Sequence, residues 1–423
     1  MKKLSVWLLC SLLLAGCAHE ELDLQQSVAS PDYSVKISPE EAILRASLMI
    51  DKLDGTQTRL GGKRTVKDVK LLGNLTADRH TRSDNGADSL FYLINFEDEQ
   101  GFALMSADRR TLPVYALSET GSLTEEDMKR DGLKQIMAGI TADAIIRINT
   151  ANDSINADWV VGPNPTFPDP GDLWFKPNFW VVGPRLKGNI SKISFGKPFN
   201  KYCKTNSGEL SNTACTVAAA AAIMWYYKWP DSYKDYSFDW DNPEDNDFET
   251  IAKLTHAIGF TENLNVEYRG TAGPMSANPG YIPRTFKNMG YSSPSLVNKN
   301  FFETEALMLE VLETEPIYFS GFSFVPQSDG SYDFRGGHSW VIDGYYAYYD
   351  NQPHNETIPF QRMYHCVWGW EGNCNGYYYI ANKKAFIGKP DMPDSSLPED
   401  NTCAENVYYN AYFEYYYGMK PNK

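Results

Sequence analysis

The sequence lacks several features that would place it in large classes of protein. Positive charge is scarce: 39 Lys and Arg residues stand against 54 Asp and Glu, a formal net charge of −15. Such a chain repels nucleic acid and anionic membrane surfaces, so nucleic acid is excluded as a partner. The sequence also has no Cys-x-x-Cys or His-x-x-x-His spacing, and we therefore expect no metal and no other cofactor.

Apolar segments long enough to cross a membrane are also missing. The N-terminus instead carries two lysines, a short apolar run over residues 4–14, and then Ala15, Gly16 and Cys17. This arrangement is typical of an export signal and resembles a bacterial lipobox, in which Cys17 would receive lipid. The alternative is an ordinary signal peptide cut near Ala15. We expect an exported, membrane-anchored lipoprotein, periplasmic or at the cell surface, with or without release after maturation.

The cysteines are few and, after processing, odd in number. Of seven, Cys10 leaves with the signal and Cys17 takes lipid, so five remain. In an oxidising compartment, one free reactive thiol plus two disulfides is the simplest arrangement. Sequence leaves three pairings open among the remaining four, Cys203, Cys366, Cys374 and Cys403.

The length of 423 residues fits two domains plus linkers. Composition and proline content divide the chain into five segments: a signal peptide (1–17), a flexible tether (18–37), a small α+β domain (38–150), a proline-rich linker (151–187) and a second domain (188–423). An exposed proline-rich joint is a site where a protease can cut the chain.

Local patterns predict the main elements of both domains. The first domain should contain a helix from Pro39, strands over 90–96 and 102–106, and a helix from about 124 to 148. The second domain should open with an alanine-rich helix over 213–229 and then become rich in strands. These strands are expected over 339–346, 364–368, 376–381 and 406–417.

Two residues of the second domain could carry nucleophilic chemistry. Cys215 begins the alanine-rich helix, where the helix N-terminus favours a thiolate. His338 follows Gly336 and Gly337 at the start of a strand, where it could take the thiol proton. Taken alone, each is more often a buried core residue. Trp368-Gly-Trp370 could likewise be plain core, or could shield a thiolate–imidazolium pair from water.

Together these segments resemble the streptopain-like cysteine proteases, which have a papain-like fold. The resemblance rests on Ala214-Cys215 opening a small-residue helix, on Gly337-His338-Ser-Trp-Val-Ile-Asp-Gly344, and on Trp368-Gly-Trp370. Order and spacing agree with the family. The resemblance implies a central helix packed on an antiparallel sheet, with Cys215 as nucleophile, His338 as base and Gly337, Trp368 and Trp370 as supporting residues.

The first domain carries a resemblance of its own. The stretch from Gly101 to Arg109, followed by 113–121, looks like the inhibitory prodomain of streptopain. It implies a zymogen whose own prodomain blocks the protease until the linker is cut, and peptide or protein substrates thereafter.

Two positions depart from the family pattern. Phe195 stands where a Gln usually serves the oxyanion, and Val367 stands where an Asn usually orients the histidine; neither side chain can form hydrogen bonds. Substitute oxyanion donors could be Ser194, Asn212 or Thr213. Substitute partners of His338 could be Asn373 or Asn375, because strand alternation places Asp343 on the opposite face. These departures keep one rival open: a catalytically impaired relative that acts as a peptide-binding or protease-inhibiting surface lipoprotein.

Overall fold

The chain was analysed as a computed structural model that describes residues 35–57, 64–75, 89–151, 154–156, 159, 178–183, 186–271, 277–297, 301–326, 332–349, 361–380 and 410–423. Cys17, the signal peptide, most of the tether and most of the linker lie outside the described residues. Within the described ranges, no helix has both the length and the apolar character to cross a membrane.

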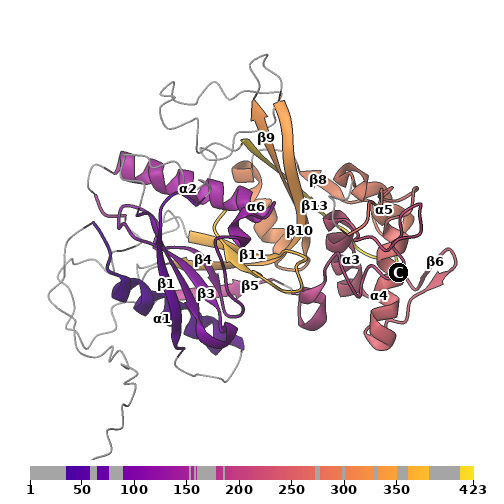
Figure 1. Cartoon of the computed structure of the whole chain (residues 1–423), viewed down its shortest axis with the longest axis horizontal. Helices are drawn as coiled ribbons and strands as arrows, with labels where there is room; N and C mark the ends of the chain where they lie inside the picture. Colours follow the sequence, from indigo (N-terminus) through magenta and orange to yellow (C-terminus); the bar gives the residue numbers. More distant parts are fainter. Residues whose placement is uncertain are drawn as a thin grey trace, which may run out of the picture.

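The N-terminal domain packs two helices against a four-stranded antiparallel layer (Figure 1). Its elements are α1 (Pro39–Gln57), β1 (Val66–Leu72), β2 (Phe91–Phe96), β3 (Phe102–Ser106), β4 (Val114–Ser118), a short 3-10 turn η2 (Asp127–Lys129) and α2 (Leu133–Thr150). The hydroxyl of Ser38 accepts the Glu41 N–H at 3.2 Å, as expected for a cap at this helix start.

The second helix of this domain begins later than the sequence predicts. Thr124 and Asp127 do exchange capping hydrogen bonds, but these hold only the η2 turn. The chain then passes through Gly132, whose φ of 89° is a left-handed conformation that no helix interior accepts. Helix α2 therefore starts at Leu133, and the segment 130–132 becomes a short connection between the two.

The C-terminal domain is more helical than the sequence predicts. Its described elements are β5 (Asn178–Val182), α3 (Cys215–Tyr227), β6 (Ser232–Tyr233), β7 (Tyr236–Ser237), α4 (Asp245–Ile258), α5 (Ile282–Asn288), β8 (Ser295–Val297), α6 (Phe301–Leu312), β9 (Ile317–Pro326), β10 (Tyr332–Tyr349), β11 (Gln361–Val367), β12 (Gly376–Tyr378) and β13 (Asn410–Tyr417). The 3-10 turns η1 (Glu97–Glu99), η4 (Gly188–Lys192) and η5 (Pro279–Tyr281) complete the described elements. The strand-rich part expected after the first helix is present as β8 to β13, but α4, α5 and α6 were not predicted.

The predicted α+β class, with a central helix against an antiparallel sheet, is confirmed. Helix α3 packs on β10 and β9, and its alanines are buried. Small side chains allow this close approach of helix and sheet.

A single sheet joins the two domains. Strand order is β1-β2-β3-β4-β12-β11-β10-β9-β13-β8, and β5 pairs with β10. The junction is the antiparallel pair β4–β12, in which Tyr377 faces Leu117 and Tyr378 faces Ala116. Main-chain hydrogen bonds therefore tie the N-terminal domain to the strands that lead toward His338.

The expectation of two disulfides is wrong for the described cysteines. Cys203, Cys366 and Cys374 are buried free thiols, and Cys215 is a half-buried free thiol. Burial raises the pKa of Cys203 to about 11 and that of Cys374 to about 12, so both are held as unreactive thiols. Cys403 lies outside the described residues.

Candidate active site

Cys215 occupies the first position of α3. Ala214, in an extended conformation, caps the helix, and its carbonyl accepts the N–H of Val217 at 3.0 Å. The backbone amides of Ser339, Thr216 and Cys215 itself lie close enough to the sulfur to favour its charged form. Three backbone amides thus act on one sulfur, and one of them comes from the residue directly after His338.

The environment of Cys215 pulls its pKa in two directions. Burial is the larger effect and raises the pKa of the thiol, while the three N–H groups lower it. Asp131, from the N-terminal domain, adds a nearby negative charge that raises it further. In this state the sulfur is held as a neutral thiol.

His338 lies in β10, paired with Gly321 of β9, and only 6% of it is exposed. Its Nε2 donates to the Trp368 carbonyl at 2.7 Å, so Nδ1 is the nitrogen that carries no proton in the neutral ring. Burial lowers the pKa of His338 to about 4, the Trp368 carbonyl opposes this effect, and the positive charge of Arg130 adds to it. The imidazole is therefore neutral at physiological pH.

Trp368, whose carbonyl holds His338, is itself held through its N–H by Asn375. The Asn375 Oδ1 accepts the Trp368 N–H at 3.1 Å, and its Nδ2 donates to the Ser191 carbonyl at 2.8 Å. The Asn375 carbonyl accepts the Ser118 hydroxyl of β4 at 2.8 Å. Asn375 thus links the N-terminal domain to the peptide that orients His338.

These contacts correct the predicted partners of the histidine. Neither Asn373 nor Asn375 accepts its proton in the hydrogen bonds of the described residues: Asn373 is exposed and Asn375 acts one step away. Asp343 binds His365 at 2.6 Å and the Leu186 N–H at 2.5 Å, away from His338 as strand alternation predicts.

The two departures from the family pattern are apolar packing positions. Val367 is buried against α3. It cannot orient His338 as the usual Asn side chain would, but the backbone carbonyl of Trp368 orients the ring instead. Phe195 packs against the apolar cluster that contains Trp370, and its carbonyl accepts the Thr213 N–H at 2.8 Å.

Of the side chains proposed as substitute oxyanion donors, Asn212 is engaged elsewhere, because its amide donates to the Thr271 carbonyl. The Ser194 hydroxyl accepts the Gly196 N–H, and the buried Thr213 hydroxyl lies beside Cys203. The backbone N–H groups at the start of α3 remain the donors nearest the sulfur.

A stack of three indoles supports the histidine. Trp340 and Trp368 are fully buried with ring centroids 5.0 Å apart, and Trp370 stacks on Trp368 at 5.3 Å. The His338 ring lies 5.1 Å from Trp370. Gly337 permits tight strand pairing here, because a Cβ on it would lie 2.6 Å from the ring of Phe322.

The N-terminal domain covers this site with residues 130–132, a segment that no sequence pattern had singled out. A Cβ on Gly132 would lie 2.8 Å from the Cβ of His338. A Cβ on Gly336 would lie 2.7 Å from the Asp131 carboxylate, and the Arg130 guanidinium lies 4.9 Å from the centre of the Trp370 ring. Residues 130–132 therefore touch the histidine, its flanking glycine and its tryptophan.

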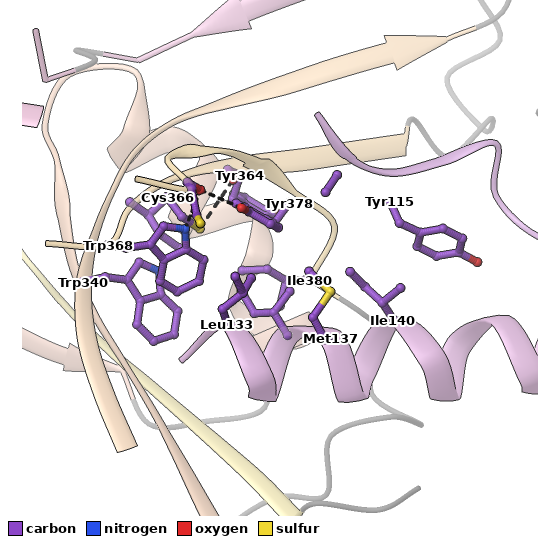
Figure 2. Close-up of a cluster of buried hydrophobic side chains, with 14 of the residues drawn as sticks. Tyr115, Leu133, Met137, Ile140, Trp340, Tyr364, Cys366, Trp368, Tyr378 and Ile380 are labelled. Atoms are coloured by element: carbon purple, nitrogen blue, oxygen red, sulfur yellow. Dashed lines mark hydrogen bonds between the residues drawn. The ribbon is translucent and has the colours of Figure 1, made fainter. Parts of the chain in front are cut away.

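Helix α2 continues this contact with apolar side chains. Figure 2 shows Leu133, Met137 and Ile140 pointing from α2 toward the cluster that holds Trp340 and Trp368. All five are buried in one core that both domains build. The connection 130–132 is thus pressed onto the site by a hydrophobic interface.

Comparison with known proteins agrees with this geometry. Residues 194–378 match the Peptidase C10 family, and residues 34–143 match the Spi protease inhibitor family. The C-terminal domain thus matches a cysteine peptidase family, and the N-terminal domain matches a protease-inhibitor family.

Streptopain of Streptococcus pyogenes is 23% identical over 431 residues, covering 90% of this chain and 92% of its own. The thiol protease/hemagglutinin PrtT of Porphyromonas gingivalis is 23% identical over 368 residues, 78% of this chain; the match spans only 38% of that protein. A mutant fragment of Prevotella intermedia prointerpain A aligns over 84% of this chain and 100% of its own, with 16% identity and a TM-score of 0.49.

The chain is thus a C10 cysteine protease zymogen, and its N-terminal domain is an inhibitory prodomain. The contacts of residues 130–132 give that inhibition a physical basis. A protease of this kind uses a thiolate beside an imidazolium. The prodomain places the negative Asp131 near the sulfur and the positive Arg130 near the imidazole, which disfavours both charges.

Replacing Gly132 by alanine should loosen the prodomain. The new Cβ meets His338 at 2.8 Å, and the φ of 89° is strained for alanine. We expect Cys215 in the full-length variant to react with iodoacetamide about tenfold faster than in the wild type. The reason is that a strain of roughly 1–2 kcal/mol weakens the binding of the prodomain over the site. Gly121→Ala is the matched control, because its φ is 76° with no atom within 4 Å of the added Cβ. Equal rates in the two variants would contradict the close contact.

The low pKa of His338 predicts acid sensitivity of the zymogen. Unfolding restores the histidine to its ordinary pKa near 6.5 from about 4, so the unfolded chain binds more protons between these values. The free energy of unfolding should fall by about 3 kcal/mol as pH drops through this window. The measurement compares the wild type with His338→Gln by urea denaturation across this pH window. The raised pKa of Asp131 has the opposite effect on the free energy of unfolding, but it is present in both proteins and therefore cancels in the comparison. An unchanged pH slope in the variant would contradict the assignment.

Proposed function

We propose that this chain is an exported cysteine endopeptidase that cuts peptide bonds through Cys215 and His338. The observation that carries the proposal is the position of the Cys215 sulfur, at a helix N-terminus and near the backbone amide of Ser339, the residue that follows His338. A thiol in this position can become a thiolate once the charges of the prodomain are withdrawn.

The chemistry follows from this placement. Nδ1 of His338 takes the Cys215 proton, and the sulfur attacks the carbonyl carbon of the peptide bond. His338 then returns the proton to the leaving amine, which departs and leaves a thioester on Cys215. A water molecule, deprotonated by His338, attacks the thioester, and the carboxylic acid is released as the thiol re-forms.

The oxyanion requires donors that the family pattern does not supply here. Phe195 replaces the usual Gln, and the N–H groups of Cys215 and Thr216 are the groups that can take over, since both already face the sulfur. One oxyanion donor is worth about 10²–10³ in rate. We therefore expect a slower enzyme than a relative with Gln, with the orientation of His338 unimpaired.

Activation would occur by a cut within the linker, residues 151–187, followed by departure of the prodomain. The hydrogen bond of Asn375 to Ser118 and the β4–β12 pairing would be lost at that step, whereas the contacts of Asn375 with Trp368 and Ser191 lie wholly within the catalytic domain. The orientation of His338 therefore survives maturation.

The rival proposal, an impaired relative that binds peptides or inhibits proteases, draws on Phe195 alone. Cys215→Ala separates the two. The variant should fold, because alanine suits the start of this alanine-rich helix, and it should lose all hydrolysis of casein. A thiol-directed epoxide should label Cys215 of the matured wild type. Absence of both labelling and hydrolysis in the wild type would favour the rival.

The lipobox leads to a separate test of location. We propose that Cys17 carries a lipid that holds the protein to a bacterial membrane. Cys17→Ser should move the protein from the membrane fraction to the soluble fraction of the expressing bacterium, measured by immunoblot after ultracentrifugation. Cys10→Ser is the control and should leave the fractionation unchanged. A Cys17→Ser protein that stays in the membrane fraction would require another attachment.

A further inference from the structure

The end of the indole stack is the binding surface nearest the proposed chemistry. Trp340 and Trp368 are fully buried, so Trp370 is the member that borders His338 on the covered side of the site. In the zymogen only 7% of Trp370 is exposed, because the prodomain lies on it. Departure of the prodomain uncovers an indole face beside the catalytic imidazole.

The prodomain places a cation on this face. The Arg130 guanidinium lies 4.9 Å from the ring centroid, and 45% of its side chain stays exposed to water. Its carboxylate partner, Asp127 at 3.1 Å, belongs to the prodomain as well and leaves with it. The face of Trp370 is thus occupied by a side chain that a substrate could also provide.

Three physical facts favour a cationic occupant. Tryptophan has the strongest cation–π attraction of the aromatic side chains, and guanidinium stacks flat on its face. Acidic residues outnumber basic ones between residue 179 and the C-terminus, so the field of the catalytic domain attracts cations. Glu371 follows Trp370 directly and is exposed.

The location of Trp370 fixes which side of the scissile bond is bound. His338 returns its proton to the leaving amine, so the residue that supplies this amine must lie next to the imidazole. With 5.1 Å between the two rings, a side chain on Trp370 belongs to that residue or to the next one along the substrate.

We propose that Trp370 is a specificity subsite that takes an Arg or Lys side chain immediately after the cut, and that Arg130 fills this subsite in the zymogen. The substrate class is then proteins with exposed basic segments. The inference rests on the proposed peptidase function, and it adds a preference that the catalytic pair alone does not impose.

The test is a cleavage profile. Full-length protein that has matured in vitro is incubated with a denatured proteome, and the new N-termini are sequenced by mass spectrometry. We expect Arg and Lys at the first two positions after the cut to be enriched about fivefold in the wild type. Trp370→Phe should keep part of this preference and Trp370→Leu should lose it, whatever the overall cleavage rate, because enrichment is compared among the cuts that each variant makes. Absence of enrichment in the wild type, or full enrichment in Trp370→Leu, overturns the subsite.

A second readout needs no turnover. Two alanine hexapeptides are compared, one with a single Arg and one with its uncharged isostere citrulline. Each is added at increasing concentration while the labelling of Cys215 by iodoacetamide is measured. The Gly132→Ala protein is used if the wild type does not mature. Protection by the Arg peptide at a severalfold lower concentration supports the subsite, and equal protection overturns it. If the peptidase proposal itself is wrong, the proteome will show no cuts at all, independently of how the two peptides protect Cys215.

Discussion

The close contact between Gly132 and His338 is the constraint on which the inhibited state depends. It requires a residue without a Cβ in a left-handed conformation, placed just before α2. Because the backbone approaches so closely, the flanking residues bring opposite charges to opposite partners. Burial is the largest effect that disfavours a thiolate at Cys215 and an imidazolium at His338, and Asp131 and Arg130 add to it in the same sense. The site is covered and is also set to the wrong protonation state for catalysis.

The shared sheet explains why this contact is firm. The β4–β12 pair and the α2 interface fix the prodomain on two sides of the site, one by main-chain hydrogen bonds and one by apolar burial. Asn375 lies where these meet. It accepts a hydroxyl from the prodomain through its carbonyl and holds the Trp368 peptide through its side chain. Prodomain binding and histidine orientation therefore share a residue, although only the first is lost on activation.

The sequence predicted those parts of the fold that depend on local pattern and resemblance. The α1 start, strand β3 and the helix that opens at Cys215 were predicted to within a residue or two, because caps, alternation and alanine content are local signals. Helices α4, α5 and α6 were missed. The joining of two domains in one sheet was missed as well, since β12 has only three residues and its partner lies about 260 positions earlier.

The hydrogen-bond partners of the predicted site residues were missed. Orienting a histidine with a backbone carbonyl leaves no trace in side-chain identity, so the acceptor was sought among asparagines. The segment 130–132 carried one signal that could have been used, a glycine between a capped turn and an apolar helix. Such a glycine indicates a break and a close approach. The prediction of two disulfides was wrong because it rested on the number of cysteines alone, which does not show that the described ones are buried as free thiols.

The most direct measurement of the central claim is the pH dependence of Cys215 reactivity before and after maturation. The rate of alkylation by iodoacetamide follows the thiolate fraction, so its midpoint reports the apparent pKa of the sulfur. The account predicts a midpoint above the ordinary thiol value in the zymogen. It predicts a midpoint well below that value in the matured enzyme, where Asp131 and Arg130 are gone and the imidazole can take the proton. The same midpoint in both forms would contradict the claim that the prodomain controls the charge state of the site.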